Sequence, residues 1–423
     1  MSMKKDYIII RELAKQLAEI AAQPINEERR KLWCKLNALK PERPMYLIDE
    51  LPWHELNVDG ELTLQCQDET CKMIENDLRR QLYRYKYVRD DYVYEPVVYV
   101  QKVIRGIEES NALTGVPFNY GISIKDDVVS TDPNNLVVAH SYHDQLVSEE
   151  DLEKLRCPDI CLDDDETKKR EEIANEALSD ILTVRMDGFT PWYCGWDMVV
   201  MWRGVENVIY GFVDEPEFMH KLIRKVLDIT LQALDKLEEQ GLLSWPQRTI
   251  HCAGAWTDIL PQSSYAEGKS RARDLWTYGM AQILYMLSPE KHNEYEFSYA
   301  REWYSRFGFG YYGCCEPLDD RLEYVKKIPN LRKISASAWV KDYDRFSESL
   351  EGKYVMVIKP SPSCLLDGGW NRELIENNLR SLLESAKKYN NACEFNLKDI
   401  STVNHHPERI GEWSDIMRKL VGG

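Results

Sequence analysis

Short apolar runs alternate with longer amphipathic stretches along most of the chain. Eight runs of four to eight residues are apolar almost throughout, which is the pattern of strands buried on both faces of a parallel sheet. They are residues 45–48, 97–103, 181–186, 247–253, 309–315, 331–337, 353–359 and 393–400.

The stretches between these runs carry apolar residues three and four positions apart, as amphipathic helices do. The clearest is 216–240, where Asp214 and Glu215 precede the helix, Pro216 fits its first turn and Gly241 follows its end. The first 40 residues also predict helix, with a break at Pro24.

Eight strands alternating with helices predict an α/β fold, a (β/α)₈ TIM barrel. We expect residues 1–42 to form an N-terminal helical extension and residues 43–423 to form the barrel. A doubly wound open sheet is the alternative. It is less favoured because no predicted strand is followed by a G-x-G-x-x-G turn or a P-loop.

Composition narrows the class of protein. With 43% hydrophobic and 30% charged residues in 423, the chain is typical of a globular protein. No stretch approaches the ~18 apolar residues of a membrane span, and the start MSMKKDYIII is too short in apolar residues for a signal peptide. We therefore expect a cytoplasmic protein with no membrane partner.

Charge and cysteine content bear on the partners and on the compartment of the protein. A net charge of −17 argues against a nucleic-acid partner. The 11 cysteines have no regular spacing, which fits a reduced compartment in which most of them are small buried hydrophobic residues.

In barrels of this type the active site lies at the C-terminal ends of the strands. Cys314, Cys315 and Glu316 lie at such an end, and His251 lies at another. Thiolate, imidazole and carboxylate are the ligands of Zn²⁺, so these four residues are candidate zinc ligands. The alternative is a pair of small buried cysteines with a structural role.

Three further polar residues near predicted strand ends are candidates for proton transfer. Asp258 follows the 247–253 run, Lys359 ends the 353–359 run, and Asp399 follows Lys398 in the last run. A carboxylate and an amine near one pocket can act as general base and general acid. The lysines and Asp399 could instead form interior ion pairs.

Aromatic residues supply a candidate substrate-binding surface. Trp192 and Trp196 lie in the segment 190–204, and Tyr312 precedes the cysteine pair. Such side chains can form an apolar lip for a flat ligand. Ordinary hydrophobic packing beneath a loop is the alternative for the tryptophans.

Three stretches resemble the uroporphyrinogen decarboxylase superfamily, which also contains the corrinoid-linked methyltransferases. They are LSPEKHNEYEFSYAREWYSRFG, YYGCCEPLDDRLEYVKKIPNLRKIS and FNLKDISTV. The likeness runs from about Arg43 to the C-terminus and is strongest after Trp256. The GCCEPL block is similar to a branch of uncharacterised, mostly anaerobe-associated proteins. The resemblance implies a (β/α)₈ barrel.

The methyltransferase branch has a His-x-Cys-Gly motif that supplies two zinc ligands. Only Cys314 matches a ligand of that motif, because Tyr312 stands at the histidine position, and Cys364 is a loose match to a further cysteine ligand. The decarboxylase branch carries an N-terminal Gly-Arg signature that is missing near residues 44–54. The resemblance therefore favours the methyltransferases. It implies zinc, a separate corrinoid protein as partner and a homodimer, since relatives often dimerise.

Three functions follow from the sequence. The first is a zinc-dependent methyltransferase that moves a methyl group between a small methylated substrate or thiol and a separate corrinoid protein. The second is a cofactor-free decarboxylase or lyase of a small carboxylated substrate such as a tetrapyrrole, with Asp258 and Lys359 as acid–base groups. The third is a non-catalytic barrel that binds a ligand or a protein through its tryptophan segment.

Overall fold

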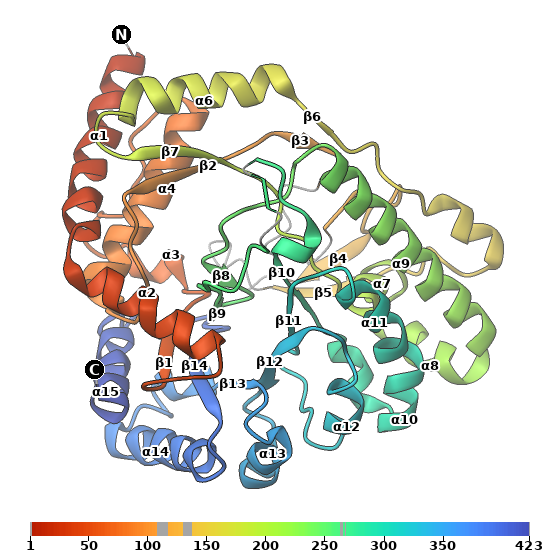
Figure 1. Cartoon of the computed structure of the whole chain (residues 1–423). Coiled ribbons are helices and arrows are strands. Elements are labelled where there is room, and N and C mark those ends of the chain that lie inside the picture. Colours follow the sequence, from red (N-terminus) through yellow and green to blue (C-terminus); the bar gives the residue numbers. More distant parts are fainter. Residues whose placement is uncertain (1, 108–116, 130–137, 263–264, 267, 423) are drawn as a thin grey trace.

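A curled parallel sheet of six strands forms the centre of the computed structural model, which describes residues 2–107, 117–129, 138–262, 265–266 and 268–422 (Figure 1). Its strands, in spatial order, are β1 (Met45–Ile48), β14 (Ala392–Leu397), β13 (Val355–Ile358), β12 (Leu331–Ala336), β11 (Phe309–Tyr312) and β10 (Trp276–Gly279). All five neighbouring pairs are parallel. The sheet therefore makes half a barrel.

The order of the strands distinguishes this sheet from a doubly wound one. From β10 to β14 each strand lies beside the next in the chain, and β1 lies beside the last, with Met45 opposite Glu394. A doubly wound sheet reverses its order at a switch point. Helices α13 (Tyr343–Leu350), α14 (Arg372–Lys388) and α15 (Glu408–Val421) follow the last three strands on the outside of the curve (Figure 1). The doubly wound alternative is wrong for this region.

Two further parallel strands form a separate pair. β2 (Val97–Gln101) pairs with β7 (Thr183–Asp187), and an isolated parallel bridge joins Tyr193 to Gly279 at the end of β10. Within the described residues, strand pairing does not close these eight strands into one ring. The α/β class and the half-barrel are shown, and the complete barrel is not.

One predicted strand is wrong and another strand was missed. The 247–253 run forms the tight hairpin β8 (Thr249–Ile250) and β9 (Ala253–Gly254), because His251 and Cys252 have φ angles of 44° and 66°. Positive φ at both central residues is what a two-residue hairpin turn requires. The missed strand is β10, because Thr277 and Gly279 interrupt the apolar run that a buried strand would show.

The β8–β9 hairpin lies between the β2–β7 pair and the six-stranded sheet (Figure 1). Before it, the Arg248 guanidinium lies 3.9 Å from the ring centre of Tyr99 in β2. On the other side, the Gly254 carbonyl accepts a 2.6 Å hydrogen bond from Lys333 of β12. The hairpin thus bridges the two groups of strands and brings its turn into the interior.

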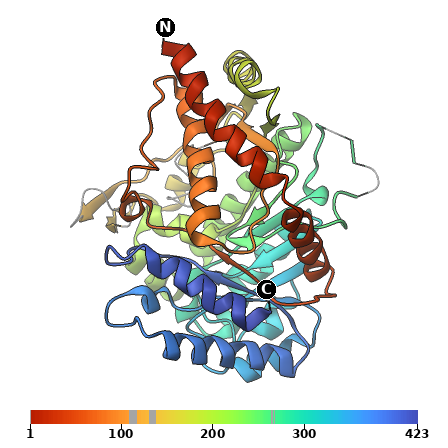
Figure 2. The same cartoon turned by 90° about the vertical axis from the view of Figure 1, so that its left-hand side faces the viewer.

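The N-terminal residues are helical as predicted. α1 (Ser2–Ala21) ends before Pro24, which begins α2 (Pro24–Asn37). α1 lies alongside α4 (Glu69–Tyr83) and also contacts α6 (Asp164–Leu178) (Figure 2). α9 (Pro216–Glu239) matches the clearest predicted helix. Among the described residues, none of the helices is both long and apolar enough to cross a membrane.

Candidate functional site

The two cysteines lie just beyond β11, where the chain turns at Gly313. This glycine has φ 98°, and a Cβ on it would lie 2.8 Å from Leu318 Cδ1 and 2.9 Å from Ser335 Cβ. Only glycine adopts such a conformation without strain. The turn lets both thiols gather on one side, with Cys314 Sγ and Cys315 Sγ 3.5 Å apart.

The end of β14 brings Lys398 and Asp399 to these thiols. Lys398 Nζ lies 3.2 Å from Cys314 Sγ, and the Cys315 thiol donates to Asp399 Oδ2 at 3.1 Å. Glu50, which follows β1, forms an ion pair with Lys398 at 3.2 Å and accepts a hydrogen bond from the Asp399 backbone N–H at 3.1 Å. Three strand ends therefore contribute to one hydrogen-bonded network.

Cys314, Cys315 and Asp399 form a set of possible metal ligands among the described residues. One ligand atom from each lies within 4.8 Å of the others. Two thiolates and a carboxylate with one open position match a three-ligand zinc site. Asp399, expected as a proton-transfer residue, thus belongs with the cysteines. Neither Glu316 nor His251 is part of this set.

The surroundings of Cys314 favour its thiolate form over the thiol. A hydrogen bond from Cys315 and the charges of Lys359 and His251 hold the pKa of Cys314 well below its usual range, against the effect of burial. The same hydrogen bond and burial raise the pKa of Cys315. Metal ligands must be deprotonated, so one of the two thiols is ready and the other would release a proton on binding.

His251 lies beside Cys314 within a stack of rings. Its imidazole stacks on the ring of Tyr278 in β10, with the ring centres 4.7 Å apart. The Trp192 ring also stacks on Tyr278, with the ring centres 5.7 Å apart. Burial lowers the pKa of His251, while the Cys314 charge opposes that shift. Trp192 and Tyr278 also pack against the apolar group that contains Cys314. Trp192 therefore lies near the thiols, and its role in substrate binding stays a prediction.

Four residues of this region have left-handed backbone conformations. They are Glu50, His251, Cys252 and Asp399, with φ between 44° and 66°. Such conformations cost of order 1–3 kcal/mol for residues other than glycine and gather at functional sites. Cys252 also donates its thiol to Glu50 Oε1 at 3.3 Å. These strand ends and the hairpin turn thus share a backbone conformation that residues other than glycine seldom adopt.

Buried carboxyl groups lie behind the cysteine pair. Glu316 Oε2 accepts a 2.9 Å hydrogen bond from the Cys314 backbone N–H, and burial raises the pKa of Glu316 to about 8. Burial also raises the pKa of Asp197 to about 7 and that of Glu296 well above its usual value. Burial therefore favours the neutral form of these three acids. In this structure, Glu316 fixes the backbone of Cys314 through its hydrogen bond to the Cys314 N–H.

Three predicted site residues lie elsewhere. The Asp258 carboxylate is exposed and pairs with Arg30 of α2 at 2.8 Å, because the chain leaves the interior after the β8–β9 hairpin. Trp196 lies on the buried side of α7 (Gly195–Arg203), where its indole N–H donates to the Tyr295 carbonyl. Tyr312 is fully buried against Phe297. The predictions that place these three at the mouth of the site are wrong.

Two contributors were missed by the sequence. Glu50 is the second residue after β1, so its position near a strand end was a usable signal. Tyr278 lies in β10, the strand that the sequence did not reveal. Lys359 was expected here, and it ends β13 as a buried ammonium 5.5 Å from the ring centre of Tyr311.

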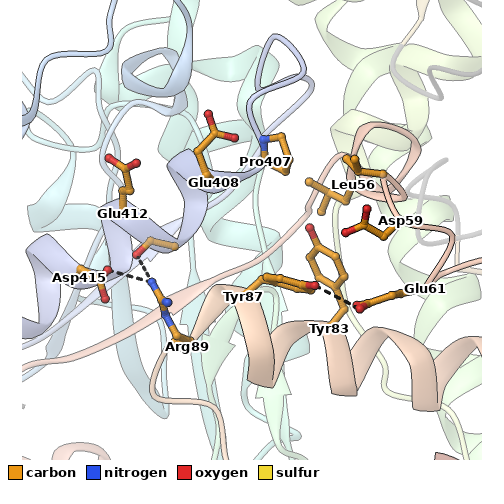
Figure 3. A pocket seen from close by; sticks show the side chains of 12 residues that line it. Leu56, Asp59, Glu61, Tyr83, Tyr87, Arg89, Pro407, Glu408, Glu412 and Asp415 are labelled. Carbon is orange, nitrogen blue, oxygen red and sulfur yellow. Dashed lines mark hydrogen bonds and ion pairs between the residues drawn. The ribbon is translucent and has the colours of Figure 1, made fainter.

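A separate cavity of about 450 Å³ lies beside α15 (Figure 3). Its described lining includes Tyr83, Tyr87 and Arg89 together with several acids. Arg89 donates to Asp415 at 2.9 Å, and the Tyr87 hydroxyl donates to Glu61 at 3.2 Å (Figure 3). None of the predicted site residues lines this cavity, so it is distinct from the cysteine site.

Comparison with known proteins gives a likeness of fold. No protein-family model matches the chain, and no curated protein does. Among solved structures, the chain is similar to a methyltransferase from Methanosarcina mazei, with a TM-score of 0.51 and 11% sequence identity over 92% of this chain and 98% of that one. At this identity the match concerns the fold alone. The chain therefore has a methyltransferase-like α/β fold.

Proposed function

We propose that this chain is a zinc-dependent methyltransferase whose metal ligands are Cys314, Cys315 and Asp399. The observation that carries the proposal is the group of three ligand atoms within 4.8 Å of one another. The methyltransferase-like fold supports it. We further propose that β2 and β7 complete a (β/α)₈ barrel whose mouth holds this site.

The residues fit the metal in kind and in number. Zinc accepts thiolate and carboxylate ligands, and three protein ligands leave a position for substrate. Lys398, 3.2 Å from Cys314 Sγ, keeps that thiolate available and can go on donating to it after a metal has bound. When bound, the zinc would supply a Lewis acid that stabilises a thiolate or polarises the heteroatom that carries a methyl group.

The reaction we propose moves a methyl group between a small substrate and the cobalt of a corrinoid held by a separate protein. The bond from carbon to the donor heteroatom breaks, its electron pair stays on the heteroatom, and the methyl cation equivalent is taken up by cobalt(I). The chain itself holds the donor against Trp192 and Tyr278, whose stacked rings lie beside Cys314. These rings can exclude water from the transfer.

Elemental analysis tests the metal. Protein purified without added metal should contain about one zinc per chain, and Cys314→Ser should lose it while its far-UV circular dichroism stays unchanged. Cys364→Ser is the matched control, because Cys364 is outside the ligand set. Full zinc occupancy in Cys314→Ser would disprove the ligand assignment.

Activity is tested with free cob(I)alamin and a panel of methyl thioethers, methyl ethers and methylamines. Formation of methylcobalamin, followed by absorbance, should depend on Cys314 and not on Cys364. Loss of a carboxyl group from an added acid in the absence of cobalamin would instead support the decarboxylase. That alternative is weakened, because its base Asp258 pairs with Arg30.

A further inference from the structure

Three buried polar groups beside Cys314 share an unusual property. Lys359 Nζ, Tyr311 Oη and His251 Nε2 are shielded from solvent, and within the described part of the chain none of them has a hydrogen-bond partner. Lys359 is 4% exposed and Tyr311 is 0% exposed. A buried polar group without a partner destabilises the fold, and more so when it is charged.

The three groups converge on one place. Lys359 Nζ lies 5.5 Å from the ring centre of Tyr311, and the His251 ring centre lies 6.0 Å from the same ring. Lys359 comes from the end of β13, Tyr311 from β11 and His251 from the turn of the hairpin. Tyr311 precedes Cys314 by three residues, and the His251 ring stacks on Tyr278, which packs against the apolar group that contains Cys314. The three groups therefore lie beside that thiol.

Alternation along β11 explains why Tyr311 points there. Neighbouring strand residues face opposite sides of a sheet. Tyr311 packs with Ile250 and Ala253 of the hairpin and with Val357 of β13, on the inner side. Tyr312 packs against Phe297 and Tyr304, among the helices. The hydroxyl of Tyr311 is therefore held in the interior, near the thiols.

Lys398, a second lysine at this site, has its charge paired by carboxylates. It pairs with Glu50 at 3.2 Å and with Asp399 at 3.1 Å. Lys359 has no such carboxylate among the described residues, and its buried ammonium has no hydrogen-bond partner there. Its charge is therefore left for an acceptor from outside the chain.

We propose that Lys359, Tyr311 and His251 form an oxyanion-binding subsite beside Cys314, and that the substrate carries a carboxylate or a sulfonate close to its reacting atom. The ammonium, the phenol and the imidazole can each donate a hydrogen bond to an oxygen of such a group. That the anion belongs to the methyl-transfer substrate rests on the function proposed above, whereas the anion site itself does not.

The test uses two alkylating reagents that differ in charge. Iodoacetate and iodoacetamide both alkylate thiolates, and only the first carries a carboxylate. On metal-free protein, with Cys314 modification followed by peptide mass spectrometry, we expect the iodoacetate-to-iodoacetamide rate ratio to exceed that of N-acetylcysteine by about tenfold or more, the size of a charge-assisted hydrogen bond. Without the subsite, the net charge of −17 would push the ratio below that reference.

Variants assign the effect to the subsite. Lys359→Met should lower the ratio by about tenfold or more, and Tyr311→Phe should lower it by a smaller factor, with iodoacetamide rates changing less in both. Lys353→Met is the matched control, because Lys353 is exposed and pairs with Glu351 at the start of the segment that leads into β13. An unchanged ratio in Lys359→Met overturns the subsite.

A second measurement covers the case in which neither reagent reaches Cys314. Sodium acetate and sodium methanesulfonate should each be compared with sodium chloride at equal ionic strength for the rise in Tm of the protein. A rise with acetate identifies a carboxylate and a rise with methanesulfonate identifies a sulfonate, and Lys359→Met should abolish either. No rise with either anion overturns the subsite. The zinc measurements use a separate readout, so either proposal can fail while the other stands.

Discussion

The Lys398 ammonium lies 3.2 Å from the sulfur of Cys314, although the two residues are 84 positions apart in the chain. Lys398 comes directly after β14 and Cys314 just after β11, so their contact depends on parallel strands that end on one face of the sheet. A cation at this distance favours the thiolate over the thiol.

Replacing Lys398 should therefore weaken that thiolate. Lys398→Met is expected to raise the pKa of Cys314 and to slow its alkylation by iodoacetamide at pH 7 by about tenfold, because a charge-assisted hydrogen bond is lost. The pH dependence of the alkylation rate checks this. Lys388→Met, which removes an exposed partner of Asp344, serves as control. An unshifted pH profile in Lys398→Met would contradict the role given to this lysine.

Zinc affinity should rise with pH because of Cys315. The pKa of Cys314 lies well below its usual range, whereas that of Cys315 is raised by its hydrogen bond to Cys314 and by burial. Near neutral pH the metal must then displace about one proton, from Cys315, so affinity should increase by about tenfold for each pH unit. Competition with a chromophoric chelator between pH 6 and 8 measures the slope. A slope of zero would mean that both thiols are already ionised, or that neither binds.

Asp197 should make the folded protein less stable as pH rises. Burial raises its pKa to about 7, above the unfolded value, so the folded state keeps a proton that the unfolded state has lost. The free energy of unfolding should fall between about pH 4 and 7, by an amount on the order of 1–3 kcal/mol.

Asp197→Asn should remove that part of the pH dependence, since asparagine can still accept the hydrogen bond from the Gln282 backbone N–H. Urea unfolding at several pH values measures it. Exposed Asp344, whose carboxylate pairs with Lys388, provides the control substitution Asp344→Asn. If wild type and Asp197→Asn keep parallel profiles, the carboxyl is not protonated in the folded protein.

Gly313→Ala should destabilise the site and the fold together. The new Cβ would meet Leu318 and Ser335 at less than 3 Å, at a φ of 98°. A cost on the order of 1–3 kcal/mol is expected in urea unfolding, with a loss of zinc because the cysteines shift. Gly368→Ala is the control, since nothing lies within 4 Å of its added Cβ. Equal stability of the two variants would show that the turn tolerates a side chain.

Periodicity and strand ends predicted much of this arrangement. Seven of the eight apolar runs contain parallel strands, and Cys314, Cys315 and Asp399 meet because the ends of parallel strands share a face. The exception is informative. The 247–253 run has the composition of a strand, but its two central residues adopt positive φ and turn the chain back. His251 therefore reaches the site from a hairpin tip and not from a strand end.

The residues that the sequence placed wrongly depend on contacts that periodicity does not report. Asp258 follows the hairpin and pairs with Arg30, which is more than 200 positions earlier in the chain. Trp196 falls one residue inside α7, on its buried side. Apolar spacing alone reveals neither the ion pair between Asp258 and α2 nor the residue at which α7 begins.

The pairing of β1 with β14 determines when the site can assemble during synthesis of the chain. Glu50 and Asp399, joined by a 3.1 Å hydrogen bond, are 349 positions apart. A ribosome makes the chain from its N-terminus, so Cys314 leaves the exit tunnel well before Lys398 is made. During that interval the nascent polypeptide carries Cys314 without the lysine whose charge favours its thiolate. The thiol gains that contribution only after the last strand has joined the sheet.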